Sequence, residues 1–170
     1  MTFDTAIASL KQGEFVMIYD SDGRENEIDM MVAAEFITPE HIARMRQHAG
    51  GLICMAIGNE LTKKLELKYM HDILSNSNDL DLDSKNMIMG TAPYGDHPTF
   101  SLSINHKRTY TGVTDSDRAL TIKEIANLCR LITLKSSLHH HSKLLVTFHY
   151  YLHQMGFYLL GKDILKCQFT

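Results

Sequence analysis

The chain has 170 residues, of which 44% are apolar and 22% are charged, and its formal net charge is −3. This length suits one domain with a substantial hydrophobic core, and so small a negative charge gives no reason to expect binding to nucleic acid or to an anionic membrane. No apolar run is long enough to span a bilayer, no signal-peptide pattern opens the chain, and Cys54, Cys129 and Cys167 are widely spaced, so we expect a cytoplasmic protein with reduced thiols.

The spacing of apolar residues predicts helices and strands that follow one another along the chain. Ile7 and Leu10 stand at helical spacing before Gly13, and Pro39 stands at the first position of a second helix. The predicted helices are 4–12, 38–50, 60–67 and 116–131, and the predicted strands are 14–19, 30–36, 52–57 and 99–106. Segment 75–98 is rich in Ser, Asn, Asp and Gly, which predicts a long loop. Because the elements lack a strict β–α–β period, the expected fold class is α+β, with helices packed on a mixed sheet.

A strongly acidic segment follows the first predicted strand. The ten residues Asp20–Asp29 (D-S-D-G-R-E-N-E-I-D) contain five carboxylates and one arginine. Carboxylates this close repel one another, so the segment is costly to order unless a divalent cation or a polar, cationic substrate neutralises it. The embedded Arg24 suits a bidentate grip on phosphate or carboxylate. A solvated acidic turn is the alternative interpretation of the same residues.

Together with three other segments, this loop resembles a known enzyme family. The string Y-D-S-D-G-R-E-N-E-I-D (19–29) is similar to the pattern D-x-x-x-R-E-x-E-x-D of the 3,4-dihydroxy-2-butanone 4-phosphate synthases. Segments 36–46 and 49–54 resemble the helix entry after that loop and a glycine-rich lead into a strand with cysteine. Segment 101–122 resembles the block F-S-x-x-x-x-H…T-G-x-T-x-x-D-R-A-x-T-I. One such motif would be weak evidence, but four in the same order and spacing are specific, and they cover about residues 4–130.

The resemblance implies a lyase of riboflavin biosynthesis that converts D-ribulose 5-phosphate into 3,4-dihydroxy-2-butanone 4-phosphate and formate. It also implies a three-layer fold, with helices on both faces of a mixed, twisted β-sheet, and a homodimer whose sites lie near the interface. The expected cofactor is Mg²⁺ or Mn²⁺, because a divalent ion is the natural Lewis acid for the paired oxygens of an enediolate. Hard ions such as Mg²⁺ prefer the carboxylate oxygens that the acidic loop offers.

By position in the family pattern, the acidic loop supplies most of the expected site. Glu25 is expected to bind the metal and the substrate, and Arg24 is expected to contact the substrate. Asp20, Glu27 and Asp29 are expected to orient substrate hydroxyls or to act as general acid and base, with Asp29 also bound to the substrate. Solvation of the loop or capping of a helix is the alternative role for these three carboxylates.

Two further candidates lie outside the loop. Thr111 is expected to donate its hydroxyl to the sugar phosphate, with a simple turn residue as the alternative. Cys54 lies in an apolar strand, where it is expected either to act in the active site or to pack as a small hydrophobe. Asp117 and Arg118 open a helix, where an acidic residue is favoured by the helix dipole, so we expect that pair to be structural.

Residues 131–170 do not fit the family pattern and are expected to form an atypical tail after a synthase-like domain over 1–130. A metal cluster at the histidine run 139–141 is one interpretation, although three adjacent residues rarely converge on one ion, and a chance apolar tail is another. A slip of the reading frame is the third interpretation of this tail. If each new codon takes the third base of one codon and the first two bases of the next, the codons of Leu160–Lys166 can encode R-K-G-H-T-E. The family carries R-x-G-H-T-E, whose histidine is a metal ligand. We therefore expect the tail to be out of frame; the alternative function is a catalytically incomplete, truncated relative with a weak metal site.

Overall fold

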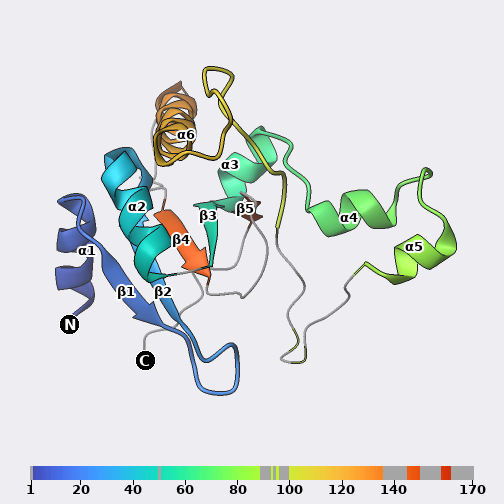
Figure 1. Ribbon diagram of the computed structural model, residues 1–170, viewed down its shortest axis with the longest axis horizontal. Coiled ribbons are helices and arrows are strands. Elements are labelled where there is room, and N and C mark those ends of the chain that lie inside the picture. Colours follow the sequence, from blue (N-terminus) through green and yellow to red (C-terminus); the bar gives the residue numbers. More distant parts are fainter. Residues whose placement is uncertain are drawn as a thin grey trace.

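Five strands of the described part of the chain form one sheet with helices packed on it, while the helical segment 70–86 extends away from the sheet (Figure 1). The computed structural model describes residues 2–49, 51–88, 93, 95, 100–135, 145–149 and 158–161. Its helices are α1 (Phe3–Lys11), the 3-10 helix η1 (Ala34–Phe36), α2 (Pro39–His48), α3 (Asn59–Lys64), α4 (Met70–Ser75), α5 (Leu82–Asn86) and α6 (Asp115–Lys135). Its strands are β1 (Val16–Tyr19), β2 (Ile28–Ala33), β3 (Leu52–Ile57), β4 (Leu145–His149) and β5 (Tyr158–Gly161).

The sheet is mixed, as the sequence predicted. Its strand order is β1-β2-β4-β3-β5, with β5 parallel to β3 and the other neighbours antiparallel. β4 lies between β2 and β3, and both strands that pair with β3 come from the segment 131–170. The segment expected to be out of frame thus contributes two strands to the sheet, while the frame slip itself stays a prediction. The histidine run 139–141 lies outside the described residues.

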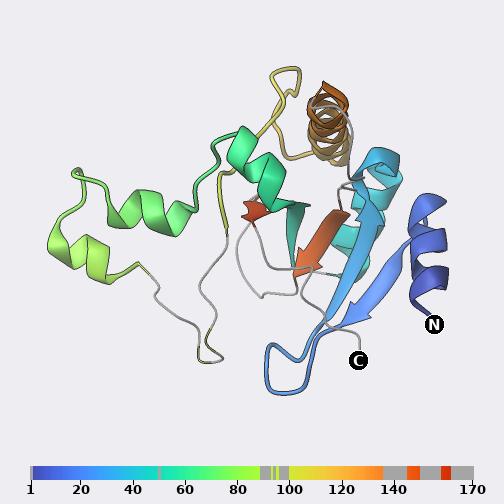
Figure 2. The same ribbon diagram turned by 180° about the vertical axis from the view of Figure 1, so that it is seen from behind.

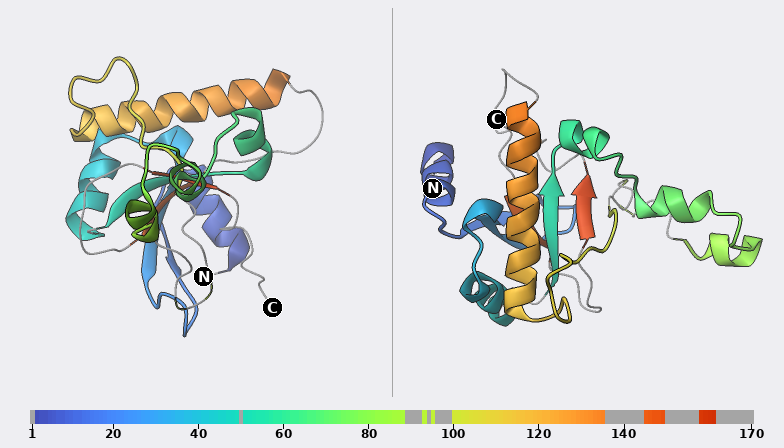
Figure 3. Two further views of the ribbon diagram at one scale, coloured as in Figure 1. Left: turned by 90° about the vertical axis from the view of Figure 1, so that its right-hand side faces the viewer. Right: turned by 90° about the horizontal axis from the view of Figure 1, so that it is seen from above.

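Both faces of the sheet are covered, and the alternation of side chains along β2 and β3 separates them. Val32, Ile53 and Met55 belong to the main hydrophobic core with residues of α2 and α6. Met31 and Cys54 are also buried but have the opposite parity, so they face the other side. Seen from the front and from behind, α2 and α1 lie on opposite sides of β1 and β2 (Figures 1 and 2), and the view from above agrees (Figure 3). The expected arrangement of helices on both faces is confirmed.

The start of α2 is set by local chemistry that the sequence already indicated. Thr38 is the N-cap and Pro39 stands in the first turn, while His41 closes a capping box with Thr38. The other ring nitrogen of His41 lies 3.0 Å from the carbonyl oxygen of Gly13, which ties α2 to the turn after α1. Gly13 itself has a φ of +76°, and a Cβ there would lie 3.0 Å from Cβ of Phe36. This position therefore favours glycine on both conformational and steric grounds.

Three predicted segments, the strand 30–36, the loop 75–98 and the strand 99–106, differ from the structure, and one helix, α4, was not predicted. The second strand begins at Ile28 and ends at Ala33, because the backbone tightens into η1 where a strand over 30–36 was expected. The expected loop 75–98 contains α5, whose N-cap Asp81 accepts a hydrogen bond from the backbone N–H of Ser84 at 2.7 Å, and α4 was not predicted at all. No strand forms over 101–106; the N–H of His106 donates instead to the Thr121 hydroxyl on α6. The pattern of apolar residues indicates which side chains are buried, but it does not indicate which groups form hydrogen bonds with the backbone N–H and C=O of the segment.

The helix α6 is the longest one described, and it packs on α2 and η1. It begins near the predicted residue but extends to Lys135, beyond the predicted end at 131. Arg46 of α2 donates two hydrogen bonds, of 3.2 and 2.9 Å, to the carboxylate of Asp115 in its first turn. These bonds lower the pKa of Asp115 and fix the two helices against each other. None of the described helices combines the length and the apolar character needed to cross a membrane.

Candidate active site

The acidic loop is the turn of the β1–β2 hairpin, so the two strands determine where it begins and ends. The backbone N–H of Asp20 donates to the carbonyl of Glu27 at 2.9 Å, which closes the loop after the last strand pair. Within it, Gly23 and Asn26 have φ angles of +84° and +54°, a region that glycine and asparagine tolerate best. The hairpin thus delivers its carboxylates from a rigid base, as the sequence predicted.

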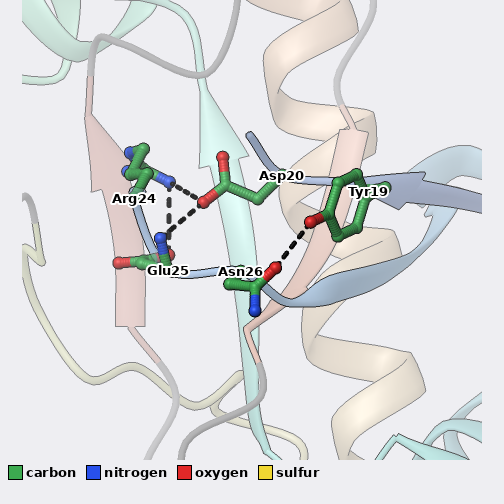
Figure 4. A network of polar contacts seen from close by, with 5 residues as sticks. All are labelled: Tyr19, Asp20, Arg24, Glu25 and Asn26. Atoms are coloured by element: carbon green, nitrogen blue, oxygen red, sulfur yellow. Dashed lines mark hydrogen bonds and ion pairs between the residues drawn. The ribbon is translucent and has the colours of Figure 1, made fainter. Parts of the chain in front are cut away.

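Asp20 lies at the centre of the polar contacts of this loop (Figure 4). Its Oδ2 accepts hydrogen bonds from the backbone N–H of Glu25 at 2.9 Å and from Nη1 of Arg24 at 3.2 Å. The same Nη1 lies 3.2 Å from Oε2 of Glu25. Arg24 therefore neutralises two carboxylates that would otherwise repel each other. Part of the neutralisation expected from a bound cation is supplied by the chain's own arginine.

The environment of Asp20 favours its ionised form. Burial raises the pKa of this carboxyl, but hydrogen bonds from the backbone N–H groups of Glu25 and Ser21, together with Arg24, outweigh burial and lower the pKa. A carboxylate with a lowered pKa is a weak base near neutral pH. Asp20 is therefore better suited to holding the loop than to transferring protons.

Tyr19, the last residue of β1, is a loop contact that was missed in the sequence. Its phenol oxygen lies 2.5 Å from Oδ1 of Asn26 (Figure 4). It also lies 2.6 Å from Oδ1 of Asp22, so it joins the two arms of the loop. The hydrogen bond to Asp22 is the main reason why the pKa of Tyr19 is raised. A tyrosine directly before an acidic turn is the sequence signal for this contact, although its place in the predicted strand 14–19 indicates only a strand residue.

Asp29 and Cys54 share one face of the sheet, although their strands do not pair directly. Val32 of β2 and Met55 of β3 both lie opposite Val146 of β4, which aligns the two strands. Counted from that register, Asp29 and Cys54 both have the opposite parity to the core residues, and β2 and β3 lie about 10 Å apart across β4. Cys54 is buried and Asp29 is half-buried. Two of the predicted residues thus lie on the same side of the sheet.

Thr111 lies far from the hairpin loop. The segment before α6, gold in Figure 1, lies at the top of the molecule beside that helix, whereas the hairpin loop lies at the bottom, and the side view agrees (Figure 3). The hydroxyl and the backbone N–H of Thr111 donate to Oδ2 of Asp117 at 3.3 and 3.0 Å. Within one chain, the structure therefore does not bring Thr111 together with Glu25.

The donor atoms of the loop fit a hard divalent cation. Among the residues that the structure describes, no group of three or more His, Cys, Asp or Glu side chains is arranged to hold a metal ion. Mg²⁺ does not need such a group, because it keeps several waters and uses one or two carboxylates. Glu25, whose side chain is mostly buried beside Asp20, supplies a carboxylate of the required kind.

Comparison with known proteins decides the family. The sequence model of 3,4-dihydroxy-2-butanone 4-phosphate synthase matches residues 4–141, which include the acidic loop, Cys54 and Thr111. The chain belongs to this family.

Its relatives are longer. The 3,4-dihydroxy-2-butanone 4-phosphate synthase of Methanothermobacter thermautotrophicus is 46% identical over 125 residues, which cover 74% of this chain and 55% of that protein. The riboflavin biosynthesis protein RibBA of Bacillus mycoides is 36% identical over 124 residues, covering 73% of this chain and 27% of the relative. The chain thus spans about half the length of the synthase from M. thermautotrophicus that it matches.

Solved structures of the same family share the fold. A 3,4-dihydroxy-2-butanone 4-phosphate synthase in complex with two magnesium ions has a TM-score of 0.59 and 26% identity, over 96% of this chain and 61% of that one. A cation-free form of such a synthase gives the same score and identity. The predicted family and fold class are confirmed.

We expect the order of the synthase loop to depend on pH in the acid range. Because the folded pKa of Asp20 is lowered, its contribution to stability is complete above the unfolded pKa of about 3.9 and is lost as the pH falls through the folded value. The NMR shift of the Glu25 amide should therefore change only below about pH 4. Asp20→Asn should remove this change, and Asp22→Asn, which removes a carboxylate of the same loop that does not accept from Arg24 or from the Glu25 amide in the hydrogen bonds described above, should keep it. A midpoint above that range would contradict the assignment.

Proposed function

We propose that this chain carries the acidic-loop half of a lyase that converts D-ribulose 5-phosphate into 3,4-dihydroxy-2-butanone 4-phosphate and formate, a step of riboflavin biosynthesis. The observation that carries the proposal is the hairpin loop, in which Asp20 holds Arg24 and Glu25 side by side. It places a cationic group for a phosphate or carbonyl oxygen next to a carboxylate for a metal ion. The expected location is the cytoplasm.

The reaction needs a proton removed next to a carbonyl, a hydroxyl lost, a carbon skeleton rearranged and a one-carbon fragment released as formate. Bound Mg²⁺, or Mn²⁺, supplies Lewis-acid stabilisation of paired enediolate oxygens. Glu25 would hold it, and Arg24 would orient the substrate. Glu27 and Asp29 are the proposed proton-transfer groups. The lowered pKa of Asp20 supports a holding role for that residue instead of proton transfer.

The distance between Thr111 and the acidic loop supports a homodimer. If both contact one sugar phosphate, they are better placed to do so from two chains, because within one chain the segment before α6 and the hairpin loop lie on opposite sides, top and bottom in Figure 1. A second copy can supply Thr111 to the acidic loop of the first. We propose this shared site, with a small sugar phosphate as the ligand.

The alternative function is a catalytically incomplete relative with a weak metal site. In the frame as written, residues 131–170 do not contain the R-x-G-H-T-E segment whose histidine is a metal ligand in the family. We propose that this segment lies in the other reading frame after about residue 130, where G-H-T-E restores a histidine ligand.

Glu25→Gln should abolish formate release in the frame-restored protein supplied with Mg²⁺, because an amide is a poor substitute for an anionic oxygen ligand. Thermal unfolding should change little, since removal of one carboxylate also relieves repulsion in the loop. Asp22→Asn is the matched control and should keep formate release. Turnover by Glu25→Gln at the parent rate would contradict the metal assignment.

Cys54→Ser separates the two roles proposed for the cysteine. If Cys54 only packs in the sheet, a buried hydroxyl should cost about 1–3 kcal/mol of unfolding free energy, while turnover per folded molecule stays near that of the parent. If the thiol acts in the active site, formate release should fall while the melting temperature holds. Cys129→Ser, also buried but on α6, is the control for burial alone.

The reading frame has a direct test. If residues 131–170 are out of frame, their sequence was not selected to complete this core, so we expect the 170-residue chain to be poorly soluble or molten, and inactive. A one-base shift near codon 131 should restore solubility and formate release together, and the DNA sequence of codons 128–133 should show where the slip lies. A well-folded 170-residue chain with full synthase activity would refute the slip.

A further inference from the structure

The carboxylate of Asp117 is the centre around which the segment before α6 folds. Its Oδ2 accepts hydrogen bonds from the backbone N–H groups of Thr111 and Gly112 at 3.0 and 2.9 Å, and Oδ1 accepts one from Tyr110 at 3.2 Å. Oδ2 also accepts the Thr111 hydroxyl at 3.3 Å. Three consecutive backbone N–H groups and one hydroxyl thus converge on one side chain. These hydrogen bonds lower the pKa of Asp117, that from Thr111 most strongly, so it stays ionised at neutral pH.

The helix α6 does not need this carboxylate for its own start. Thr114 performs that task, because its hydroxyl accepts the backbone N–H of Asp117 at 3.1 Å and its carbonyl accepts that of Arg118 at 2.9 Å. An acidic residue in a first helical turn commonly stabilises the helix itself. Here the side chain of Asp117 turns back to the preceding segment instead, so an explanation by helix stability alone leaves its four contacts unaccounted for.

The same contacts determine the position of the Thr111 side chain. Its hydroxyl donates to Asp117 and accepts from the backbone N–H of Val113 at 3.3 Å, which fixes its rotamer. The next residue, Gly112, has a φ of +75°, and a Cβ there would overlap the side chain of Asn105. The segment is therefore held from two sides, by a carboxylate on α6 and by close packing on Asn105, while Thr111 remains exposed.

We infer that Asp117 is a positioning residue for substrate binding, which acts by presenting Thr111 to the sugar phosphate. This inference rests on the proposed function, since it assumes that Thr111 contacts the substrate. In the hydrogen bonds described above, the side chain of Asp117 contacts only residues 110–112. Its effect on the substrate is therefore transmitted entirely through the geometry of residues 110–112.

The test is a double-mutant cycle in the full chain, in the reading frame that restores solubility. Asp117→Asn leaves one acceptor oxygen and puts an NH₂ group either against the N–H of Tyr110 or against those of Thr111 and Gly112, depending on the amide orientation. The exchange of at least one of these three amides should therefore rise about tenfold. The Kd for D-ribulose 5-phosphate should rise as much as in Thr111→Ala, and the double variant should bind no more weakly than Thr111→Ala alone. Asp115→Asn, in the same turn but paired with Arg46, is the matched control and should leave all three amides protected.

A second variant covers the case in which Asp117→Asn fails to fold. Gly112→Ala disturbs the same segment without touching α6, and it should weaken substrate binding to the same extent. Additive losses in the double variant, or amides that stay protected in Asp117→Asn, would overturn the inference. The inference would also be overturned if the parent binds D-ribulose 5-phosphate tightly and neither Thr111→Ala nor Asp117→Asn changes the Kd. In that case formate release by the parent still supports the proposed function. No binding by the parent would overturn both.

Discussion

The mutual position of the acidic loop and Cys54 depends on a single strand. The acidic loop leads into β2, and Cys54 lies on β3. In the described sheet these two strands do not pair with each other, but both pair with β4. The register of β4 against both neighbours sets which residues share a face and how far apart they are. A slip of one residue in either pairing would turn Asp29 and Cys54 to opposite faces. The proposed chemistry of the N-terminal half is therefore tied to β4, which begins at Leu145, far along the chain from both the acidic loop and Cys54.

Electrostatics forms a second constraint, and it acts locally. A loop with so many carboxylates folds around Asp20 because backbone N–H groups and Arg24 offset the repulsion. The same principle recurs at α6, where Asp115 pairs with Arg46 and Asp117 takes up backbone donors. In both places a carboxylate with a lowered pKa organises the polypeptide around it. Acidic residues in this family member thus have a structural role besides the chemistry proposed for them.

Much of this could be predicted from the sequence. Capping residues and apolar runs located α1, α2, β1, β3 and α6 to within a few residues, and the acidic motif located the hairpin loop. Other features depend on contacts that periodicity does not encode. Segment 101–106 has the alternating pattern of a strand, yet the backbone N–H of His106 donates to Thr121 on α6. Tyr19 fits an apolar strand by its pattern, and only the structure shows that its phenol donates a hydrogen bond to Asn26. The separation of Thr111 from the loop is likewise a matter of topology, because residues in one motif pattern need not meet within one chain.

Gly23 and Gly112 differ in what restricts the choice of side chain at their positions, and this difference determines which substitutions each position accepts. Gly23 has a positive φ but open space around it, so only the backbone conformation restricts it, and asparagine or aspartate can take its place at modest cost. Gly112 is restricted twice, by its positive φ and by the side chain of Asn105. Replacement there requires Asn105 to move as well. Natural variation at position 112 should therefore be coupled to position 105, whereas variation at position 23 should be independent of its neighbours.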